Sequence, residues 1–199
     1  MTNIIFPFDS KITYEQRKKA MTQEPRLIWL TGLSGSGKTT LSLRLEQYFF
    51  GKGFKVFVLD GDNVRKGLCK DLGFSEEDRK ENLRRVGEVA RLMLDAGLIV
   101  ISAFISPSAE DRMAIKTIVG DQRFIEIYVS CSVEVCEGRD VKGLYAKARK
   151  GIIPNFTGIS APYDPPVLPD VEVRTAEETV DESVHKIIKL VEPLLGHNK

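Results

Sequence analysis

The sequence predicts an α/β fold of three layers, in which helices cover both faces of a mainly parallel five-stranded sheet and a mobile lid lies beside it. Three observations lead to this expectation. Short apolar runs alternate with helical patterns, a glycine-rich loop joins the first run to a helix, and a stretch rich in proline and glycine interrupts the pattern late in the chain. At 199 residues the chain is long enough for one such domain. We expect an N-terminal extension over residues 1–25 and a single domain over residues 26–199.

Five apolar runs, the last four of them rich in β-branched residues, are the expected strands. They span residues 27–30, 55–60, 98–103, 124–130 and 171–174. Because the runs are apolar on both faces, they suit a parallel sheet that is covered by helices on each side. Ligands of such sheets bind at the carboxyl ends of the strands, so polar residues just after each run are the first candidates for a functional site.

Helical patterns fill the segments between the runs. The longest is expected over about residues 76–96, where Ser75 and Asp78 form a variant capping box and Gly97 ends the helix. A short helix is expected near residues 13–21, and an amphipathic helix over residues 176–195 should pack on the sheet.

A phosphate-binding loop follows the first run. Residues 32–40 read GLSGSGKTT and match the full G-x-x-x-x-G-K-[ST] pattern between a strand and a helix. Its backbone N–H groups can surround phosphates, Lys38 can reach the outer phosphates, and the Thr39 hydroxyl can ligate Mg²⁺. The sequence therefore predicts a fold of the P-loop NTPase type that binds ATP or GTP. The nucleotide-binding residues are Gly32, Leu33, Ser34, Gly35, Ser36, Gly37, Lys38, Thr39 and Thr40.

Two carboxylates and a serine follow the next two runs. Asp60 and Asp62 are suited to hold Mg²⁺ or to orient an acceptor hydroxyl, although an Asp-Gly turn that only reverses the chain is an alternative. Ser106 is placed to donate to a phosphate or sulfate, and a simple turn serine is equally consistent with its spacing.

Basic residues recur in two further places. Arg79 and Asn82 share one face of the long helix and can bind an anion, while solvated surface arginines are the alternative. Residues 139–169 combine glycines, prolines and lysines, which is typical of a mobile lid, with an ordinary charged surface loop as the alternative.

Composition limits the choice of partners and location. Lys plus Arg, 29 residues, nearly balances Asp plus Glu, 28 residues, so no global positive field indicates a nucleic-acid partner. The three cysteines lack C-x-x-C spacing and are expected to be reduced thiols. No apolar stretch approaches the roughly 18 residues of a membrane span, and no signal peptide is evident, so we expect a cytoplasmic protein without a membrane partner.

These motifs, in this order, resemble those of the adenylyl-sulfate kinases, which use ATP to phosphorylate the 3′-hydroxyl of adenosine 5′-phosphosulfate. The resemblance runs from about Arg26 to the C-terminal helix. It is carried by the segments 32–40, 59–65, 71–82, 104–107, 139–145 and 156–163.

The resemblance implies a role for each candidate residue. Asp62 would be the metal-linked catalytic acid, supported by Asp60, with Lys38 on the phosphates, Thr39 and Asp62 on Mg²⁺, and Arg149 against the adenine of ATP. The expected adenylyl-sulfate site consists of Asp62, Arg65, Phe74, Arg79, Asn82, Ile105, Ser106, Lys142, Leu144 and Phe156. Ser106 is also the position that the family treats as a phosphoserine intermediate. We expect direct transfer instead, because no candidate base flanks Ser106 and an in-line transfer needs no covalent stage.

Other readings stay open at this stage. A kinase of the same fold could act on another nucleotide or on a sugar acid, and a non-catalytic nucleotide switch could share the loop, although no Asn-Lys-x-Asp element for guanine follows a strand. Four residues depart from the family pattern and leave substrate inhibition open: Lys66, Cys69, Ser108 and Ala146. A homodimer is the expected assembly, with ATP and adenylyl sulfate as small-molecule partners.

Overall fold

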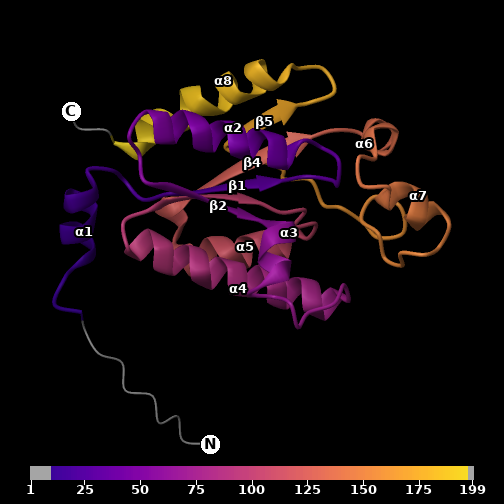
Figure 1. Ribbon diagram of the computed structural model, residues 1–199, viewed down its shortest axis with the longest axis horizontal. Helices are drawn as coiled ribbons and strands as arrows, with labels where there is room; N and C mark the ends of the chain where they lie inside the picture. Colours follow the sequence, from indigo (N-terminus) through magenta and orange to yellow (C-terminus); the bar gives the residue numbers. More distant parts are fainter. Residues whose placement is uncertain (1–9, 197–199) are drawn as a thin grey trace, which may run out of the picture.

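Five parallel strands form one sheet in a computed structural model that describes residues 10–196 (Figure 1). The strand order is β2-β3-β1-β4-β5. The strands are β1 (Leu27–Thr31), β2 (Val56–Asp60), β3 (Ile99–Ala103), β4 (Phe124–Ser130) and β5 (Val171–Arg174). Every strand pairing is parallel, so the predicted sheet is confirmed, with each expected strand within one residue of the observed one.

Helices cover both faces of this sheet (Figure 1). On one face lie α2 (Lys38–Gly51) and α8 (Val180–Val191), and on the other lie α4 (Glu76–Asp95) and α5 (Ala109–Val119). The remaining helices are α1 (Tyr14–Met21), α3 (Gly61–Lys66), α6 (Val133–Arg139), α7 (Leu144–Arg149), and the short 3₁₀ helices η1 (Asp121–Arg123) and η2 (Glu192–Leu195). No helix within residues 10–196 is long and apolar enough to cross a membrane.

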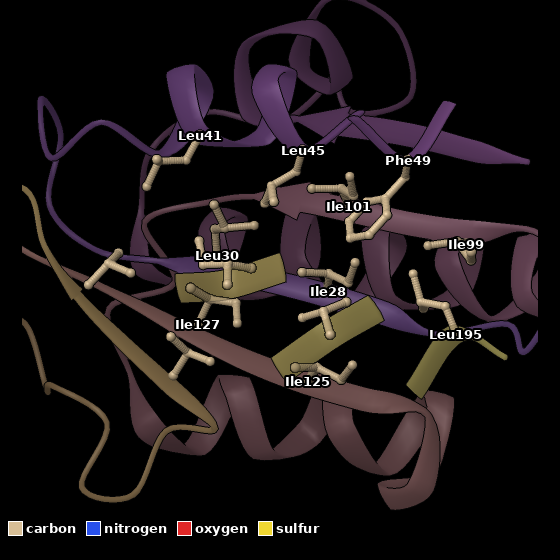
Figure 2. Close-up of a cluster of buried hydrophobic side chains, with 14 of the residues drawn as sticks. Ile28, Leu30, Leu41, Leu45, Phe49, Ile99, Ile101, Ile125, Ile127 and Leu195 are labelled. Atoms are coloured by element: carbon tan, nitrogen blue, oxygen red, sulfur yellow. The ribbon is translucent and has the colours of Figure 1, made fainter. Parts of the chain in front are cut away.

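Alternate residues of β1 point to opposite cores. Ile28 and Leu30 pack beneath α2 and α8 in the cluster that Figure 2 shows, whereas Leu27 and Trp29 pack against α4 and α5. All four side chains are fully buried. Because both faces are apolar, the central strand is fixed in position, and so is the loop that follows it.

The C-terminal helix is shorter than the sequence analysis expects. The N–H groups of Glu177 and Glu178 bond to the carbonyl of Arg174 in a turn, and Thr179 then forms a capping box with Glu182, so α8 begins at Val180 rather than at residue 176. Pro193 near the start of η2 marks the change from α-helix to 3₁₀ helix.

The expected lid contains α7 and little other regular structure. A small cluster of its own fixes it against the phosphate-binding loop, formed by Leu33, Cys136, Tyr145, Ala148 and Phe156. The first nine residues of the expected N-terminal extension, and residues 197–199, lie outside the described part of the chain.

Candidate active site

A cavity of about 1260 Å³ lies at the carboxyl ends of β1, β2 and β3, as parallel sheets of this kind predict. The phosphate-binding loop and the start of α2 form one wall. The acidic turn, α4, the loop after β3 and the lid form the others.

The phosphate-binding loop has the backbone geometry that an anion site needs. Gly32 has φ of +154°, and a Cβ there would lie 2.5 Å from the carbonyl oxygen of Val129, so only glycine fits. Gly37, with φ of +101°, precedes α2 without a side-chain cap. The first N–H groups of α2 therefore have no capping side chain, and they suit a phosphate.

Lys38 lies folded over this loop. Its Nζ donates to the carbonyl oxygens of Gly32, at 2.9 Å, and Leu33, at 2.7 Å. Burial lowers the pKa of Lys38 to about 8. A polyphosphate would supply the counter-charge that this buried amine lacks.

The acidic turn meets the start of α2. The Oδ2 of Asp60 accepts a hydrogen bond of 3.0 Å from the Thr39 hydroxyl, and its Oδ1 accepts one of 3.0 Å from the N–H of Asp62. The Asp62 carboxylate forms an ion pair with Lys142 of the lid. Hydroxyl and carboxylate oxygens are the donors that Mg²⁺ prefers, so these residues fit that ion. Within residues 10–196, no three His, Cys, Asp or Glu side chains form a metal-binding group of their own.

A platform of side chains from α3, α4 and the segment between them faces the loop. The guanidinium of Arg65 lies over the Phe74 ring, 4.4 Å from its centroid. Arg79 donates to the carbonyl oxygens of Phe74, at 3.0 Å, and Asn155, at 2.7 Å. Asn82 is buried beside the cavity, and its Oδ1 accepts no hydrogen bond from a described residue. A ligand donor could meet this acceptor.

Ser106 lies at the bottom of the cavity. It is 2% exposed and has φ of +39°. Its Oγ donates to the Thr31 hydroxyl, at 2.9 Å, and accepts from the Trp29 indole, at 3.0 Å. Neither partner is a base, and Ile105 lines the cavity beside it.

The lid contributes the last wall. Lys142, Leu144 and Phe156 line the cavity. The Phe156 ring packs edge-on against Tyr145, with 4.9 Å between centroids, and the Tyr145 hydroxyl donates to the carbonyl oxygen of Ser34 at 2.9 Å. The lid is thus joined directly to the phosphate-binding loop.

Some predicted residues lie elsewhere. Arg149 is outside the cavity wall, where its guanidinium forms two hydrogen bonds of 2.8 and 2.9 Å with Glu137. Gly32, Leu33 and Ser36 lie behind the lining residues of the loop rather than among them. All the predicted acceptor-site residues line the cavity.

Arg139 and Thr175 are among the wall residues that the sequence analysis did not name as site residues. Arg139 donates to the carbonyl oxygens of Gly35, at 3.2 Å, and Thr175, at 2.5 Å. The Thr175 hydroxyl donates to the backbone carbonyl oxygen of Ser36 at 2.8 Å. Thr175 directly follows β5. Its place at a strand end was the signal that could have identified it.

Comparisons with known proteins agree with one another. A family described as adenylylsulphate kinase matches residues 24–174. The chain is 53% identical over 188 residues to an adenylyl-sulfate kinase of Staphylococcus epidermidis, with 94% of each chain covered.

Solved structures extend the agreement to the fold. The chain resembles the Mycobacterium tuberculosis APS kinase in complex with AMPPNP and APS, with 44% identity, a TM-score of 0.82, and coverage of 85% of this chain and 98% of that one. A gluconokinase from Sinorhizobium meliloti has a TM-score of 0.58 at 17% identity, with 86% of this chain and 94% of that one covered. That likeness concerns the fold alone.

Proposed function

The chain belongs to the adenylyl-sulfate kinase family, and we propose that its cavity transfers the terminal phosphoryl group of ATP to the 3′-hydroxyl of adenylyl sulfate, giving 3′-phosphoadenylyl sulfate and ADP for sulfate assimilation. One observation carries the proposal. A single cavity joins a phosphate-binding loop to a platform with an aromatic ring, two guanidinium groups and an unpaired amide oxygen. These groups suit a nucleotide whose 5′ end carries two anionic groups.

ATP is proposed to bind along the loop. The N-terminus of α2 and Lys38 would hold the β- and γ-phosphates, and Arg139 and Thr175 would lie beside the rest of the nucleotide. Arg149 keeps its predicted role near the adenine only if its ion pair with Glu137 opens.

Adenylyl sulfate is proposed to bind on the platform. Its base would stack on Phe74, whose side chain is well exposed, and Asn82 would accept a hydrogen bond from it. Arg65, Arg79 and Lys142 would neutralise the phosphosulfate. Ile105, Leu144 and Phe156 supply apolar walls.

The transfer itself is proposed to be direct. The 3′-oxygen attacks the γ-phosphorus, the bond from that phosphorus to the bridging oxygen of ADP breaks, and the proton of the hydroxyl passes to the Asp62 carboxylate. Lys142 must first release Asp62, which links binding of the acceptor to the lid. Thr39, Asp60 and Asp62 are the residues that would hold Mg²⁺, which offsets charge on the phosphates when it is bound.

A covalent route through Ser106 has less support. Its hydroxyl is buried between Thr31 and Trp29, neither of which can remove its proton. We therefore propose that Ser106 shapes the acceptor site.

We further propose a cytoplasmic location, which the three free cysteines favour. The homodimer and the division into residues 1–25 and 26–199 stay predictions. Sedimentation of the purified chain would measure the first, and a truncation beginning at residue 26 would test the second.

An acceptor screen tests the proposed function. With ATP and Mg²⁺, release of ADP is followed with adenylyl sulfate, AMP and gluconate as acceptors. We expect adenylyl sulfate to be used with the highest kcat/KM, and the product to carry phosphate on its 3′-oxygen. Preference for gluconate would identify a sugar-acid kinase, and nucleotide binding without transfer to any acceptor would identify a switch.

A further inference from the structure

A buried arginine supports the floor of the acceptor site from behind. Arg112 of α5 is 4% exposed and does not line the cavity. Its Nε donates to Glu126 of β4 at 2.8 Å, one Nη donates to the carbonyl oxygen of Ser106 at 2.8 Å, and the other donates to that of Asp164 at 2.7 Å. One guanidinium thus joins a strand, the acceptor loop and the C-terminal end of the lid.

A chain of hydroxyl groups joins the same parts. Thr31 donates its proton to the carbonyl oxygen of Ile105 at 2.8 Å. Its oxygen therefore accepts from Ser106, at 2.9 Å, and from the Tyr163 hydroxyl, also at 2.9 Å. Burial raises the pKa of Tyr163, so this hydroxyl keeps its proton as a donor.

Both groups act on a backbone that needs support. Ser106 has φ of +39°, which a residue with a Cβ adopts at a cost unless its surroundings hold it there. Arg112 holds its carbonyl oxygen, and Thr31 and Trp29 hold its hydroxyl. The lid is joined to the next residue, because the N–H of Asp164 donates to the carbonyl oxygen of Pro107 at 2.8 Å.

We propose that Arg112 and Tyr163 are positioning residues that hold Ser106 and the lid end in register, and thereby set the affinity for the acceptor. The proposal rests on the proposed function for the identity of that acceptor. Arg112 needs its planar fork for this role, because four acceptors surround it and a lysine cannot reach all of them. Tyr163 needs only its hydroxyl.

Matched pairs of variants test the positioning role. Arg112→Lys is compared with Arg123→Lys. Arg123 is a partly buried arginine with an ion pair to Asp95, and it directly precedes β4, at the end of that strand away from the cavity. Tyr163→Phe is compared with Tyr128→Phe. The Tyr128 ring stacks on that of Tyr163, and its hydroxyl makes no hydrogen bond to a residue within 10–196.

Steady-state kinetics provide the first measurement. We expect Arg112→Lys to raise the KM for adenylyl sulfate about tenfold, the equivalent of 1.4 kcal/mol, while the KM for ATP changes less than about twofold. Tyr163→Phe should raise the KM for adenylyl sulfate about threefold, and the two control variants should leave this KM unchanged. Equal changes in both KM values, or equal effects of Arg112→Lys and Arg123→Lys, would show a merely structural role.

The fluorescence of Trp29 provides a second measurement that needs no substrate. Trp29 is the sole tryptophan, and its indole donates to the Ser106 hydroxyl, so its emission reports on that hydroxyl directly. Arg112→Lys and Tyr163→Phe should shift the emission, and both controls should leave it as in wild type. Unshifted emission in Tyr163→Phe overturns the proposal even if Arg112→Lys does not fold. If the wild-type protein does not phosphorylate adenylyl sulfate, the proposed function is wrong. The Trp29 emission of the variants still tests the positioning role in that case.

Discussion

The two halves of the cavity are built in different ways. The half that binds phosphates is formed mainly by the nine consecutive residues of the phosphate-binding loop, to which Arg139 and Thr175 are hydrogen-bonded, and its shape is set by the backbone at Gly32 and Gly37. The acceptor half is built from side chains of α3, α4, the loop after β3 and the lid, segments that only the fold brings together. A local motif can therefore give the first half its chemistry, whereas the second depends on long-range contacts. We expect substitutions in the first to affect catalysis with any acceptor, and those in the second to affect acceptor choice.

The largest effect is expected at Lys38. Lys38→Met keeps the volume but removes the charge, so activity should fall about a thousandfold with every acceptor, since groups that stabilise developing charge contribute about 10² to 10³ each and ATP binding weakens as well. The melting temperature should not fall, because burying this charge opposes folding at neutral pH. Activity above a tenth of wild type would contradict the role of the loop.

Asp62 lies where the two halves meet, and its substitution should separate chemistry from binding. Asp62→Asn keeps the shape but removes the proton acceptor, so kcat should fall about a hundredfold, within the range of general bases. The dissociation constant of ATP should change far less, which calorimetry can measure. Equal losses of kcat and of ATP affinity would indicate that Asp62 has only a structural role in the turn. Normal turnover would indicate that Asp60, whose carboxylate accepts a hydrogen bond from Thr39, is the proton acceptor instead.

Arg79 tests whether the acceptor half is independent. Arg79→Ala should raise the KM for adenylyl sulfate at least about tenfold, because it removes a cation from the platform, and should leave the KM for ATP nearly unchanged. Arg84→Ala is the control, since Arg84 lies on the same helix but pairs with Glu81 at the surface. If Arg79→Ala weakens both substrates equally, the two halves are not separate.

The same contrast explains what the sequence could predict. The strands and the phosphate-binding loop were predicted within one residue or better, because apolar runs and glycine motifs are local signals. Spacing made Arg79, Asn82 and Ser106 candidates for anion binding, but only the family resemblance assigned them, with the other residues, to an adenylyl-sulfate site. Nothing in the sequence indicated the role of Arg112, because its partners lie on three segments that are far apart along the chain.

Individual side-chain contacts within the acceptor half also could not be predicted from the sequence. The Lys142–Asp62 ion pair joins residues 80 positions apart, and nothing local indicates it. Two departures from the family pattern have structural roles that only the fold reveals: Cys69 is buried in the core beneath α4, and Ser108 caps α5.

Ser106 should show an intermediate effect. Ser106→Ala removes a buried hydroxyl and leaves the Trp29 donor unpaired, so kcat/KM for adenylyl sulfate should fall by about 1 to 3 kcal/mol and activity should stay measurable. Mass spectrometry of wild-type protein quenched during turnover should find no phosphoserine. Complete loss of activity together with trapped phosphoserine would instead support a covalent route.

The smallest expected effect is a pH dependence of ATP affinity, which arises in the half of the cavity that contains the phosphate-binding loop. In the free protein burial lowers the pKa of Lys38 to about 8, and bound phosphates favour the charged amine, so ATP binding should take up a proton above that pH. Between pH 7 and pH 8.5 the affinity for ATP should fall about fourfold, whereas acceptor affinity should not follow this curve. Calorimetry in buffers of different ionisation enthalpy measures the uptake, and Lys38→Met should abolish it. The same shift affects the free energy of unfolding. The folded-state pKa of Lys38 lies below the unfolded value of 10.5, so the unfolded chain binds more protons between about pH 8 and 10.5. The contribution of Lys38 to stability therefore rises with pH in this range. If Lys38→Met keeps the wild-type pH dependence of ATP binding, another group titrates in the loop half and the two halves share their electrostatics.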